Sequence, residues 1–574
     1  MIDRQLSPDL DGSLALRAER LGPLPLINHV IGRLGLDEEL EKAVATTDPR
    51  VRVAPARALG VLVRSILVER EPIYRQQEMV NTFAPGCFGL SEATRGHVGD
   101  DVIGRALDRL FDADRASLLT AVVVAVGERF GLSLAELHND STSVRFCGRY
   151  ALATGRRVRG IRAPAITYGH SKDHRSDLKQ LLFILTTSGD GGVPVQFRCE
   201  AGNTNDDRTH IETWDALCRV TGDPGFLYVA DSKLCNRDAL DHIDRRRGRF
   251  LCVMPRSRKE DKRFRRWLQT HDPAWELVRD RPNPRQRGGP RDRWWTFRES
   301  IPSAEGWPIV WVRSALLALH QEQSRRERIA VVEEALEELR AKLASPHARH
   351  VTRQAVMTRV DALLRKQHAA RYVKVKLRSV QEESFKQERP GRPGANTRYV
   401  RKVRRHWRPE WEIDEAAIAY DKKSDGMYPL LTNDRELSNA QFLDAHKRQP
   451  TIEKRFEQVK SVFEIAPVLL KSESRIEALF FVYFLTLLVQ ALVERELRLG
   501  MLKARIEDLP IYPEDRPTRH PTAEQVFRLF SLAQRQVLLV DGEPVRAFPP
   551  ELTPLQRRVL DLLGISETVY TSPT

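Results

Sequence analysis

The sequence predicts a mixed α/β protein with a helical N-terminal region and a large basic insertion. Three observations favour this class. Apolar residues recur at helical spacing before residue 130, a glycine-rich turn at 188–192 separates two β-rich segments, and helix-like and strand-like segments then alternate to residue 254. The 574 residues suit three or four structural units of roughly 150 residues each. With 30% charged and 41% hydrophobic residues, wholesale disorder is excluded.

Residues 1–130 are expected to be mostly helical. Apolar residues at helical spacing follow Pro55, and the same pattern surrounds Leu107. A further helix is expected from Arg115 to Phe130, where Gly131 provides a stop signal. Short amphipathic helices of this kind suit a compact bundle.

Residues 131–255 are expected to form an α/β unit. Gln180–Thr187 and Val193–Cys199 predict a hairpin around the glycine-rich turn. The other expected elements are a strand at 134–146, a helix at 207–220, a strand at 226–230, a helix at 236–245 and a strand at 249–254.

The basic excess of the chain is confined to one internal segment. Residues 256–410 hold 38 Lys and Arg against 19 Asp and Glu, a balance of +19, whereas the whole chain carries +15. Tryptophans lie among or just beyond the arginine clusters of this segment, at positions 267, 294, 295, 407 and 411. Guanidinium groups neutralise phosphates and indoles stack on bases, so this composition favours nucleic acid as the partner. A solvated basic face is the alternative.

Within and after this segment the pattern is mixed. An Arg/Pro/Gly linker is expected at 281–293, a charged helix at 314–343 and a Pro/Gly break at 389–394. The later expected elements are β-like segments at 413–420 and 427–432, helices at 439–446, 451–463 and 475–495, and a short helix at 554–563 in a tail of unknown role. The apolar run at 478–489 is shorter than the roughly 20 residues of a membrane span, so a buried helix is expected there.

Cysteine usage and the N-terminus indicate a cytoplasmic protein. The six cysteines are scattered without a CxxC pair, which supports neither a disulfide framework nor a zinc site. The first 21 residues are interrupted by charges, unlike a secretory signal segment.

Three acids fall where metal-dependent chemistry would need them. Asp140 lies in the first β-like segment, Asp231 ends the apolar strand at 226–230, and Glu453 lies in the first turn of a helix. Glu453 and Lys460 are two α-helical turns apart, so they are expected on one face. Each acid also has an ordinary explanation, because Asp140 suits a turn, Asp231 a helix cap, and Glu453 the helix dipole.

At these residues the sequence resembles the DDE transposases of bacterial insertion sequences, specifically the insertion-sequence-four superfamily in its branch numbered sixteen thirty-four. The resemblance covers about residues 15–500. It is carried by the strings HNDST at 138–142, GHSKDHR at 169–175 with DLKQ at 177–180, VADS at 229–232, and Ile452-Glu453 followed by Lys460.

The resemblance implies an RNase H-like catalytic domain, interrupted by the basic insertion between its second and third acids. It implies that Asp140, Asp231 and Glu453 are the catalytic residues and the ligands of two Mg²⁺ or Mn²⁺ ions. Carboxylate oxygens suit these cations, and a two-metal site activates the nucleophile and stabilises the leaving oxygen at phosphorus.

The helix signature of the superfamily is only partly present. Its Tyr and Arg positions fall on His446 and Gln449, while Glu453 and Lys460 match. Arg448 or Arg455 could replace the missing arginine, and whether a DNA hairpin forms is left open. Lys460 is expected to contact a DNA phosphate. In the polar stretch before the hairpin strand, Lys172 and Arg175 could equally contact DNA or make structural hydrogen bonds.

These expectations combine into a domain plan and a function. The plan has a helical DNA-binding domain at 1–130, a catalytic domain at 131–255 and 411–505, an insertion at 256–410 and a tail at 506–574. The expected function is a transposase that binds terminal inverted repeats, cleaves at transposon ends and joins the 3′-hydroxyl to target DNA. A homodimer on double-stranded DNA without membrane association is expected, in the bacterial cytoplasm at the nucleoid. The alternatives are an inactive DNA-binding regulator and an RNase H-like nuclease without strand transfer.

Overall fold

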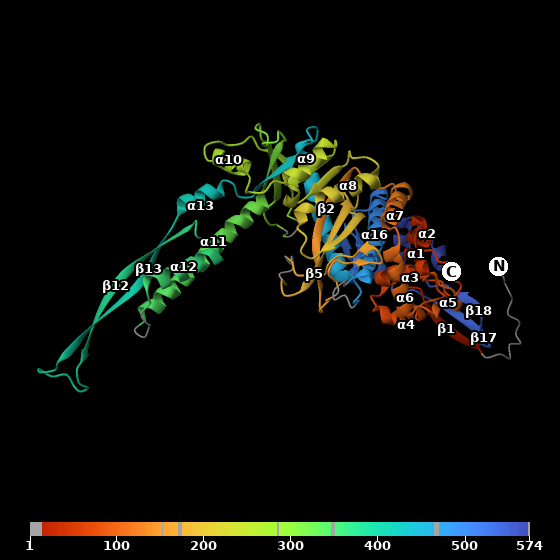
Figure 1. The fold of residues 1–574 in the computed structure, drawn as a ribbon, viewed down its shortest axis with the longest axis horizontal. Helices are drawn as coiled ribbons and strands as arrows, with labels where there is room; N and C mark the ends of the chain where they lie inside the picture. Colours follow the sequence, from red (N-terminus) through yellow and green to blue (C-terminus); the bar gives the residue numbers. More distant parts are fainter. Residues whose placement is uncertain are drawn as a thin grey trace. The chain divides into compact units, whose positions relative to one another are not determined.

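The structure is a computed structural model that describes residues 14–151, 153–169, 175–283, 286, 288–345, 351–463 and 470–571. The chain forms two compact units. Unit 1 combines Met1–Cys252 with Asp444–Thr574, and unit 2 is Val253–Leu443 (Figure 1).

A mixed sheet of five strands forms the centre of unit 1. Its strands, in spatial order, are β6 (Pro194–Ala201), β5 (Lys179–Ser188), β2 (Glu136–Phe146), β7 (Leu227–Ala230) and β8 (Arg249–Val253). β2 is antiparallel to β5 and parallel to β7, and β7 is parallel to β8. The predicted strands and the predicted hairpin are thereby confirmed.

The hairpin turn depends on glycine. Gly191 and Gly192 both have positive φ, at 80° and 65°, a backbone conformation that residues with a Cβ adopt at a cost. A Cβ on Gly192 would also collide with the side chain of Thr451. The turn can therefore lie directly against the helix that begins at Pro450.

Helices enclose this sheet and pack on one another. α8 (His210–Thr221) and α9 (Arg237–Arg245) connect the strands, close to their predicted positions. The N-terminal helices are α1 (Leu24–Leu34), α2 (Leu36–Ala43), α3 (Pro55–Val68), α4 (Gln76–Asn81), α5 (Glu92–Arg95), α6 (Asp100–Asp112) and α7 (Arg115–Phe130). Two short strands, β3 (Arg157–Val158) and β4 (Ile161–Arg162), pair with each other.

The buried core of unit 1 is built around α16 (Glu473–Lys503). This helix packs against α1, α3, α6 and β6, and Figure 1 shows it in blue among the red and orange N-terminal helices. Among the described residues it alone is long and apolar enough to cross a membrane, yet 89% of its apolar window is buried inside the protein. It is the buried helix predicted at 475–495, with extra turns at its C-terminal end.

The C-terminal tail is folded onto the N-terminal region. β1 (Leu14–Arg20) pairs antiparallel with β17 (Gln534–Val540), which pairs with β18 (Glu543–Phe548). The strand β1 was not predicted within this mostly helical region. The other tail elements are β15 (Leu509–Tyr512), β16 (Arg516–Thr518), α17 (Ala523–Leu529), α18 (Pro554–Leu563), at its predicted position, and α19 (Thr568–Thr571).

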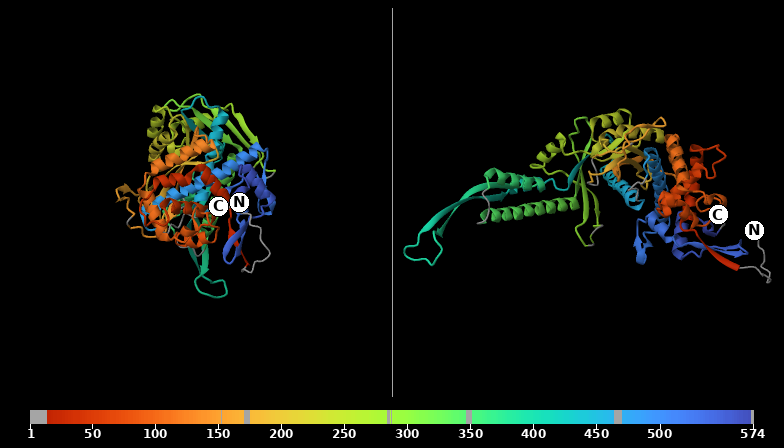
Figure 2. Two further views of the ribbon diagram at one scale, coloured as in Figure 1. Left: turned by 90° about the vertical axis from the view of Figure 1, so that its right-hand side faces the viewer. Right: turned by 60° about the horizontal axis from the view of Figure 1, so that its bottom comes forward.

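Unit 2 contains an antiparallel sheet and a long helical and ribbon extension. The sheet strands, in order, are β14 (Met427–Thr432), β11 (Ile309–Ser314), β10 (Asp292–Arg298) and β9 (Glu276–Arg281), beside α10 (Lys259–Trp267). The extension consists of α11 (Ala315–Ala344), α12 (Arg353–Lys366), the two-stranded ribbon β12 (Val373–Gln387) and β13 (Tyr399–Ile413), and α13 (Glu415–Lys422). The ribbon runs past the helices in the right-hand view of Figure 2.

The prediction of β-like structure at 413–420 is wrong, because α13 begins there. The Asp414 side chain accepts a hydrogen bond from the Ala417 backbone N–H at 2.9 Å and caps the helix. Ile418 then packs against the apolar cluster of the extension.

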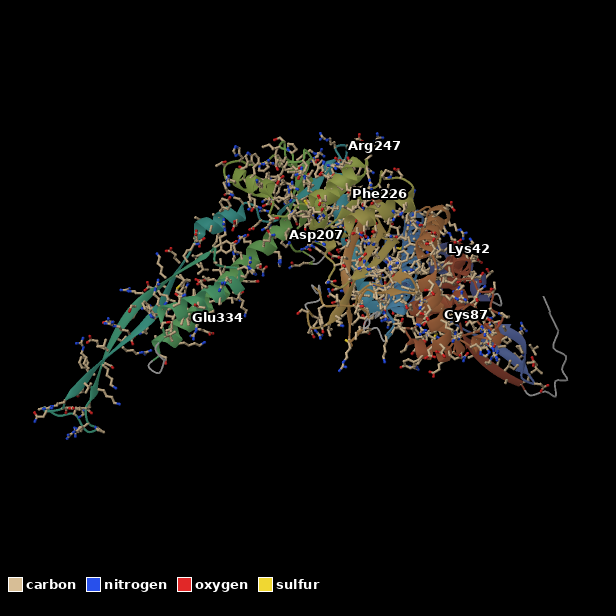
Figure 3. All side chains as sticks on the ribbon, in the orientation of Figure 1. Lys42, Cys87, Asp207, Phe226, Arg247 and Glu334 are labelled. Atoms are coloured by element: carbon tan, nitrogen blue, oxygen red, sulfur yellow. The ribbon has the colours of Figure 1, made fainter. Side chains whose placement is uncertain are left out.

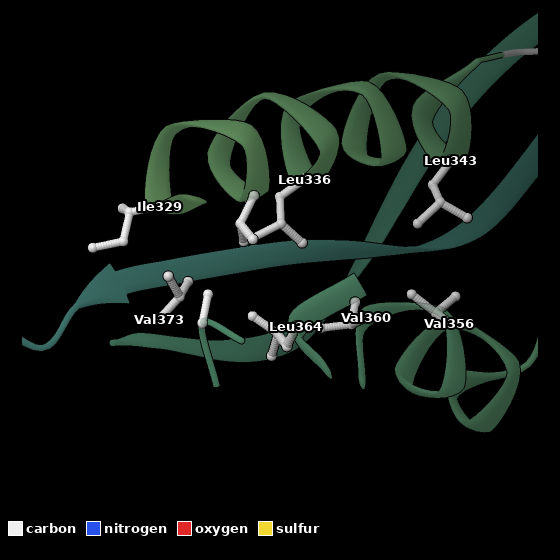
Figure 4. Close-up of a cluster of buried hydrophobic side chains, with 9 residues drawn as sticks. Ile329, Leu336, Leu343, Val356, Val360, Leu364 and Val373 are labelled. Carbon is white, nitrogen blue, oxygen red and sulfur yellow. The ribbon is translucent and has the colours of Figure 1, made fainter. Parts of the chain in front are cut away.

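That apolar cluster joins α11, α12 and the base of the ribbon (Figure 4). Its buried members are Ile329, Val332, Leu336, Leu343, Val356, Val360, Leu364, Ala369 and Val373. Arg404 of β13 adds a polar anchor, because its guanidinium donates to the carbonyls of Leu343 and Ala344 at 2.9 and 3.0 Å. These carbonyls end α11 and have no partner within the helix.

In unit 1, a buried ion pair fixes the short helix α15 (Pro450–Glu457), which follows α14 (Asn439–Arg448). The Arg455 guanidinium donates to the Glu494 carboxylate of α16 at 2.7 Å, and each side chain is 1% exposed. Arg455 also donates to the carbonyls of Gly191 and Gly192 in the hairpin turn. Burial would raise the pKa of Glu494, but the adjacent Arg455 and Arg498 outweigh burial and lower it.

We expect the Leu336→Ala variant to destabilise unit 2 by about 2–5 kcal/mol, because it leaves a cavity in the cluster. Urea unfolding followed by fluorescence would measure the loss. The matched control is Leu319→Ala on the same helix, where the leucine is 47% exposed. Equal effects of the two substitutions would contradict the described packing.

We expect Glu494→Ala to reduce the free energy of unfolding of unit 1 by about 3–5 kcal/mol, since Arg455 would be left buried without its counter-ion. Thermal and urea unfolding would test this. The double variant Arg455→Met, Glu494→Leu should recover most of the loss, because it removes both charges while keeping similar volume. A double variant as unstable as Glu494→Ala would refute this account.

Candidate active site

Asp140 and Asp231 lie side by side on neighbouring parallel strands. The register of β2 and β7 pairs His138 with Val229 and Asn139 with Ala230, so Asp140 and Asp231 are the next residues on each strand. Parallel strands are about 4.8 Å apart, and residues in register point to the same face. Both aspartates are partly exposed, at the place where β7 ends.

Local hydrogen bonds orient both carboxylates. Asp140 accepts from the Ser141 backbone N–H at 2.7 Å. Asp231 Oδ1 accepts from the Lys233 backbone N–H at 2.9 Å and so caps the short 3₁₀ turn Ser232–Leu234. The capping role considered for Asp231 from the sequence is therefore real, and it engages one of the two carboxylate oxygens.

Glu453 is directed to the same region by contacts one helical turn before it. The Gln449 side chain donates to the Asn139 carbonyl at 3.1 Å and lies 2.9 Å from His138 Nδ1. Glu453 follows Gln449 by four residues, so both share one face of the helix. Glu453 is exposed and has no hydrogen bond or ion pair with any described residue.

A second contact fixes the start of this helical segment on β2. The Arg448 guanidinium donates to the Glu136 carboxylate at 2.6 and 2.5 Å, and His138 Nε2 lies 2.7 Å from the same carboxylate. Burial would raise the pKa of Glu136, but the hydrogen bonds from His138 and Arg448 outweigh it and lower the pKa to about 2. Glu136 therefore stays charged at neutral pH and holds Arg448.

Glu136 is absent from the sequence-based predictions, and His138 and Gln449 appear there only as positions of the family motifs, without a supporting role. One signal was available, since Glu136, His138 and Asp140 alternate along β2 and so share one face. The partner residues on α14 and α15 are more than 300 positions away, so the pattern could not identify what covers this face.

Asp140 and Asp231 thus belong to neighbouring parallel strands or their ends, and Glu453 lies on the helix that follows the contact of Gln449 to β2. Among the described residues, no group of three or more His, Cys, Asp or Glu is close enough to hold a metal ion. The donor chemistry nevertheless suits a hard divalent cation, because carboxylate oxygens are its preferred ligands. Neither Asp231 nor Glu453 forms an ion pair with a described residue, so their charges are not neutralised by a neighbouring side chain.

The residues predicted to contact DNA differ in their exposure and in their partners. Arg455 is buried and paired with Glu494, whereas Arg448 is partly exposed and paired with Glu136. Arg175 is exposed and pairs with Asp177 at 2.7 Å. Lys172 lies outside the described residues.

Lys460 does not follow Glu453 along a continuous α-helix. α15 ends at Glu457, and Lys460 lies in the π-helical turn Gln458–Val462. A π turn contains more residues than an α turn, so the predicted alignment of Glu453 with Lys460 is altered.

Comparison with protein families identifies a transposase family. Residues 137–489 match the family described as Transposase DDE domain, and residues 16–124 match a domain of unknown function, DUF4277. No curated protein matches the chain. Among solved structures, the chain is similar to a piggyBac transposase in a synaptic complex with hairpin DNA, at 8% identity and a TM-score of 0.33, over 88% of this chain and 79% of that one. The match at 137–489 covers more than half of the residues and contains all three acids, so the chain belongs to the transposase DDE domain family.

Proposed function

We propose that this protein is a metal-dependent DNA transposase that cleaves phosphodiester bonds at transposon ends and transfers the 3′-hydroxyl to target DNA. The observation that carries the proposal is the register of Asp140 with Asp231 on parallel strands, beneath the helix that bears Glu453. The strand order β6-β5-β2-β7-β8, in which β5 alone runs antiparallel to the other four strands, supports an RNase H-like domain. The proposed subgroup is the insertion-sequence-four superfamily, branch sixteen thirty-four.

In this proposal Asp140, Asp231 and Glu453 hold two Mg²⁺ or Mn²⁺ ions. When bound, such ions activate the attacking oxygen and stabilise the leaving oxygen in an in-line displacement. Asp140 lies between the other two acids, since it is beside Asp231 in the sheet and two residues from the His138 contact to Gln449.

The surrounding residues position the acids and the DNA. Gln449 and Arg448 attach the Glu453 helix to β2, and the buried Arg455–Glu494 pair fixes the other side of that helix. Arg448, Lys460, Lys172 and Arg175 are the proposed phosphate contacts near the acids. Double-stranded DNA is the proposed substrate of a homodimer in the bacterial cytoplasm.

We expect Asp231→Asn to reduce DNA cleavage by at least about 10³-fold, because it removes a metal-ligand charge. Asparagine can still cap the turn at Ser232, so the fold should be retained. The assay would combine the protein, Mg²⁺, a labelled duplex with the inverted repeat that flanks its gene, and a plasmid target.

The matched control is Asp238→Asn, an exposed acid seven residues further along, which should cleave like the native protein. Full cleavage by Asp231→Asn would overturn the assignment. With the native protein, joined products support the transposase, cut ends alone support the nuclease, and a mobility shift without cutting supports the regulator.

We expect Gln449→Ala to lower the cleavage rate about 10–100-fold while DNA affinity changes little. The substitution removes the hydrogen bond to the Asn139 carbonyl, which orients the helix that bears Glu453. Gln449 thereby acts like the groups that orient metal ligands in other proteins, whose loss typically lowers activity by about this factor. Single-turnover cleavage and filter binding would separate the two effects. A rate unchanged from that of the native protein would show that this contact does not position Glu453.

A further inference from the structure

Many of the basic residues in unit 2 are paired within the protein. Arg258 contacts Glu260 and Glu305 at 2.8 and 2.7 Å, and Arg265 contacts Asp261 at 2.7 Å. Further internal pairs are Arg263–Glu299, Arg281–Asp292, Arg291–Asp280, Arg293–Asp280 and Arg325–Asp425. Part of the basic clusters at 256–266 and 281–293 is therefore engaged in holding the fold.

Several tryptophans of unit 2 also contribute to its packing. Trp294 and Trp311 are buried, and the Phe264 ring stacks on Trp311 with centroids 3.8 Å apart. Trp407 and Trp411 pack against the cluster between α11 and α12. Of the five tryptophans that the sequence suggested for base stacking, Trp294 is therefore buried, and Trp407 and Trp411 are partly buried against the cluster.

The end of the β12–β13 ribbon is different. We call Lys386–Lys402 the arm tip. It holds six Lys or Arg and one acid, Glu388, which gives a balance of +5 in 17 residues. Arg401 pairs with Glu383. The other five basic residues have no ion pair with any described residue; they are Lys386, Arg389, Arg392, Arg398 and Lys402.

The arm tip is held away from the helices that support the ribbon. The base of the ribbon is packed through Val375 and Leu377, and Arg404 is attached to the end of α11. Beyond this point side chains project on both sides of the ribbon, as Figure 3 shows. Phe385 is 63% exposed and Tyr399 is 50% exposed.

Backbone pairing and turn residues give the arm tip a defined shape. β12 and β13 remain in register out to the pair Gln387 and Tyr399, and the Glu388 N–H donates to the Arg398 carbonyl at 3.0 Å. Pro390 and Pro393 lie in the turn and restrict its backbone. An uncovered two-stranded ribbon is only marginally stable in water, which favours a partner for this surface.

We propose that the arm tip binds duplex DNA, with the ribbon in the major groove and Arg389, Arg392 and Arg398 on the phosphates beside it. The proposal rests on the proposed function, in which DNA is the substrate. The major groove is about 12 Å wide and admits a two-stranded ribbon. A protein partner is disfavoured, because five unpaired cations would have to lose their hydration against it.

The test compares two full-length triple variants that remove the same charge from unit 2. The arm variant is Arg389→Ala, Arg392→Ala, Arg398→Ala. The matched control is Arg353→Ala, Arg359→Ala, Lys366→Ala, whose three residues are exposed on α12. Binding to a labelled duplex is measured over a series of salt concentrations.

The arm variant should bind more weakly and reduce the slope of log affinity against log salt by about 2.7, or 0.9 for each of three phosphates. The control should change the slope by less than one. Equal slope changes in the two variants, or no change in the arm variant, would overturn the proposal.

A crosslink identifies the partner directly. A photoreactive benzoyl-phenylalanine replaces Tyr399, and in a control protein it replaces Val331, an exposed residue of α11. Crosslinking to labelled duplex at position 399 and not at 331 is expected. Crosslinking to a second copy of the chain, or no crosslink, would overturn the proposal.

The Asp231→Asn protein separates this proposal from the proposed function. It should lack cleavage and keep the salt slope of the native protein. Normal cleavage by Asp231→Asn with a reduced slope for the arm variant would reject the catalytic assignment and retain the arm. Loss of cleavage by Asp231→Asn with an unchanged salt slope for the arm variant would retain the catalytic assignment and reject DNA binding by the arm tip.

Discussion

The placement of the helix that bears Glu453 depends on one buried ion pair. Arg455 joins α15 to Glu494 on the core helix α16 and to the glycine turn between β5 and β6. The opposite side of the same segment is joined to β2 by Arg448 and Gln449. Glu453 lies between these two sets of contacts. An exposed acid on a short helix of eight residues is thereby held by the interior of unit 1.

The basic residues of unit 2 fall into two groups, those paired with carboxylates near its sheet and those at the arm tip. Close to its sheet, arginines and carboxylates form internal pairs, and tryptophans fill the core. At the arm tip only Arg401 has a carboxylate partner, and the other five basic residues form no ion pair with a described residue. The net charge of a segment therefore does not by itself indicate a binding surface. What distinguishes the arm tip is its excess of five basic charges, most of them without an ion pair among the described residues, together with its exposed aromatic side chains.

The strands of the unit 1 sheet were predictable because their signals are local. The glycine-rich turn predicts the hairpin of β5 and β6, and a short apolar run predicts β7. β1 was not predictable, since Leu14 and Leu16 are exposed and its partner strand is near the other end of the chain. The ribbon did carry a signal, because Val373, Val375 and Leu377 alternate with basic residues, but the high charge obscured it. At the site, the acids were indicated by sequence motifs, whereas their supporting contacts depend on tertiary structure.

The pairing of β1 with β17 has a consequence for how the protein is made. The ion pair between Glu19 and Arg535 joins residues 516 positions apart. The entropic free energy of closing a loop rises by only about 0.6 kcal/mol for each doubling of its length. The long separation of the two strands therefore has little effect on the stability of the folded protein. The separation does determine the sequence of folding events, because β1 leaves the ribosome long before β17 has been synthesised. The N-terminal helices must therefore fold with one edge incomplete, and a product of premature termination before residue 534 would keep that strand unpaired.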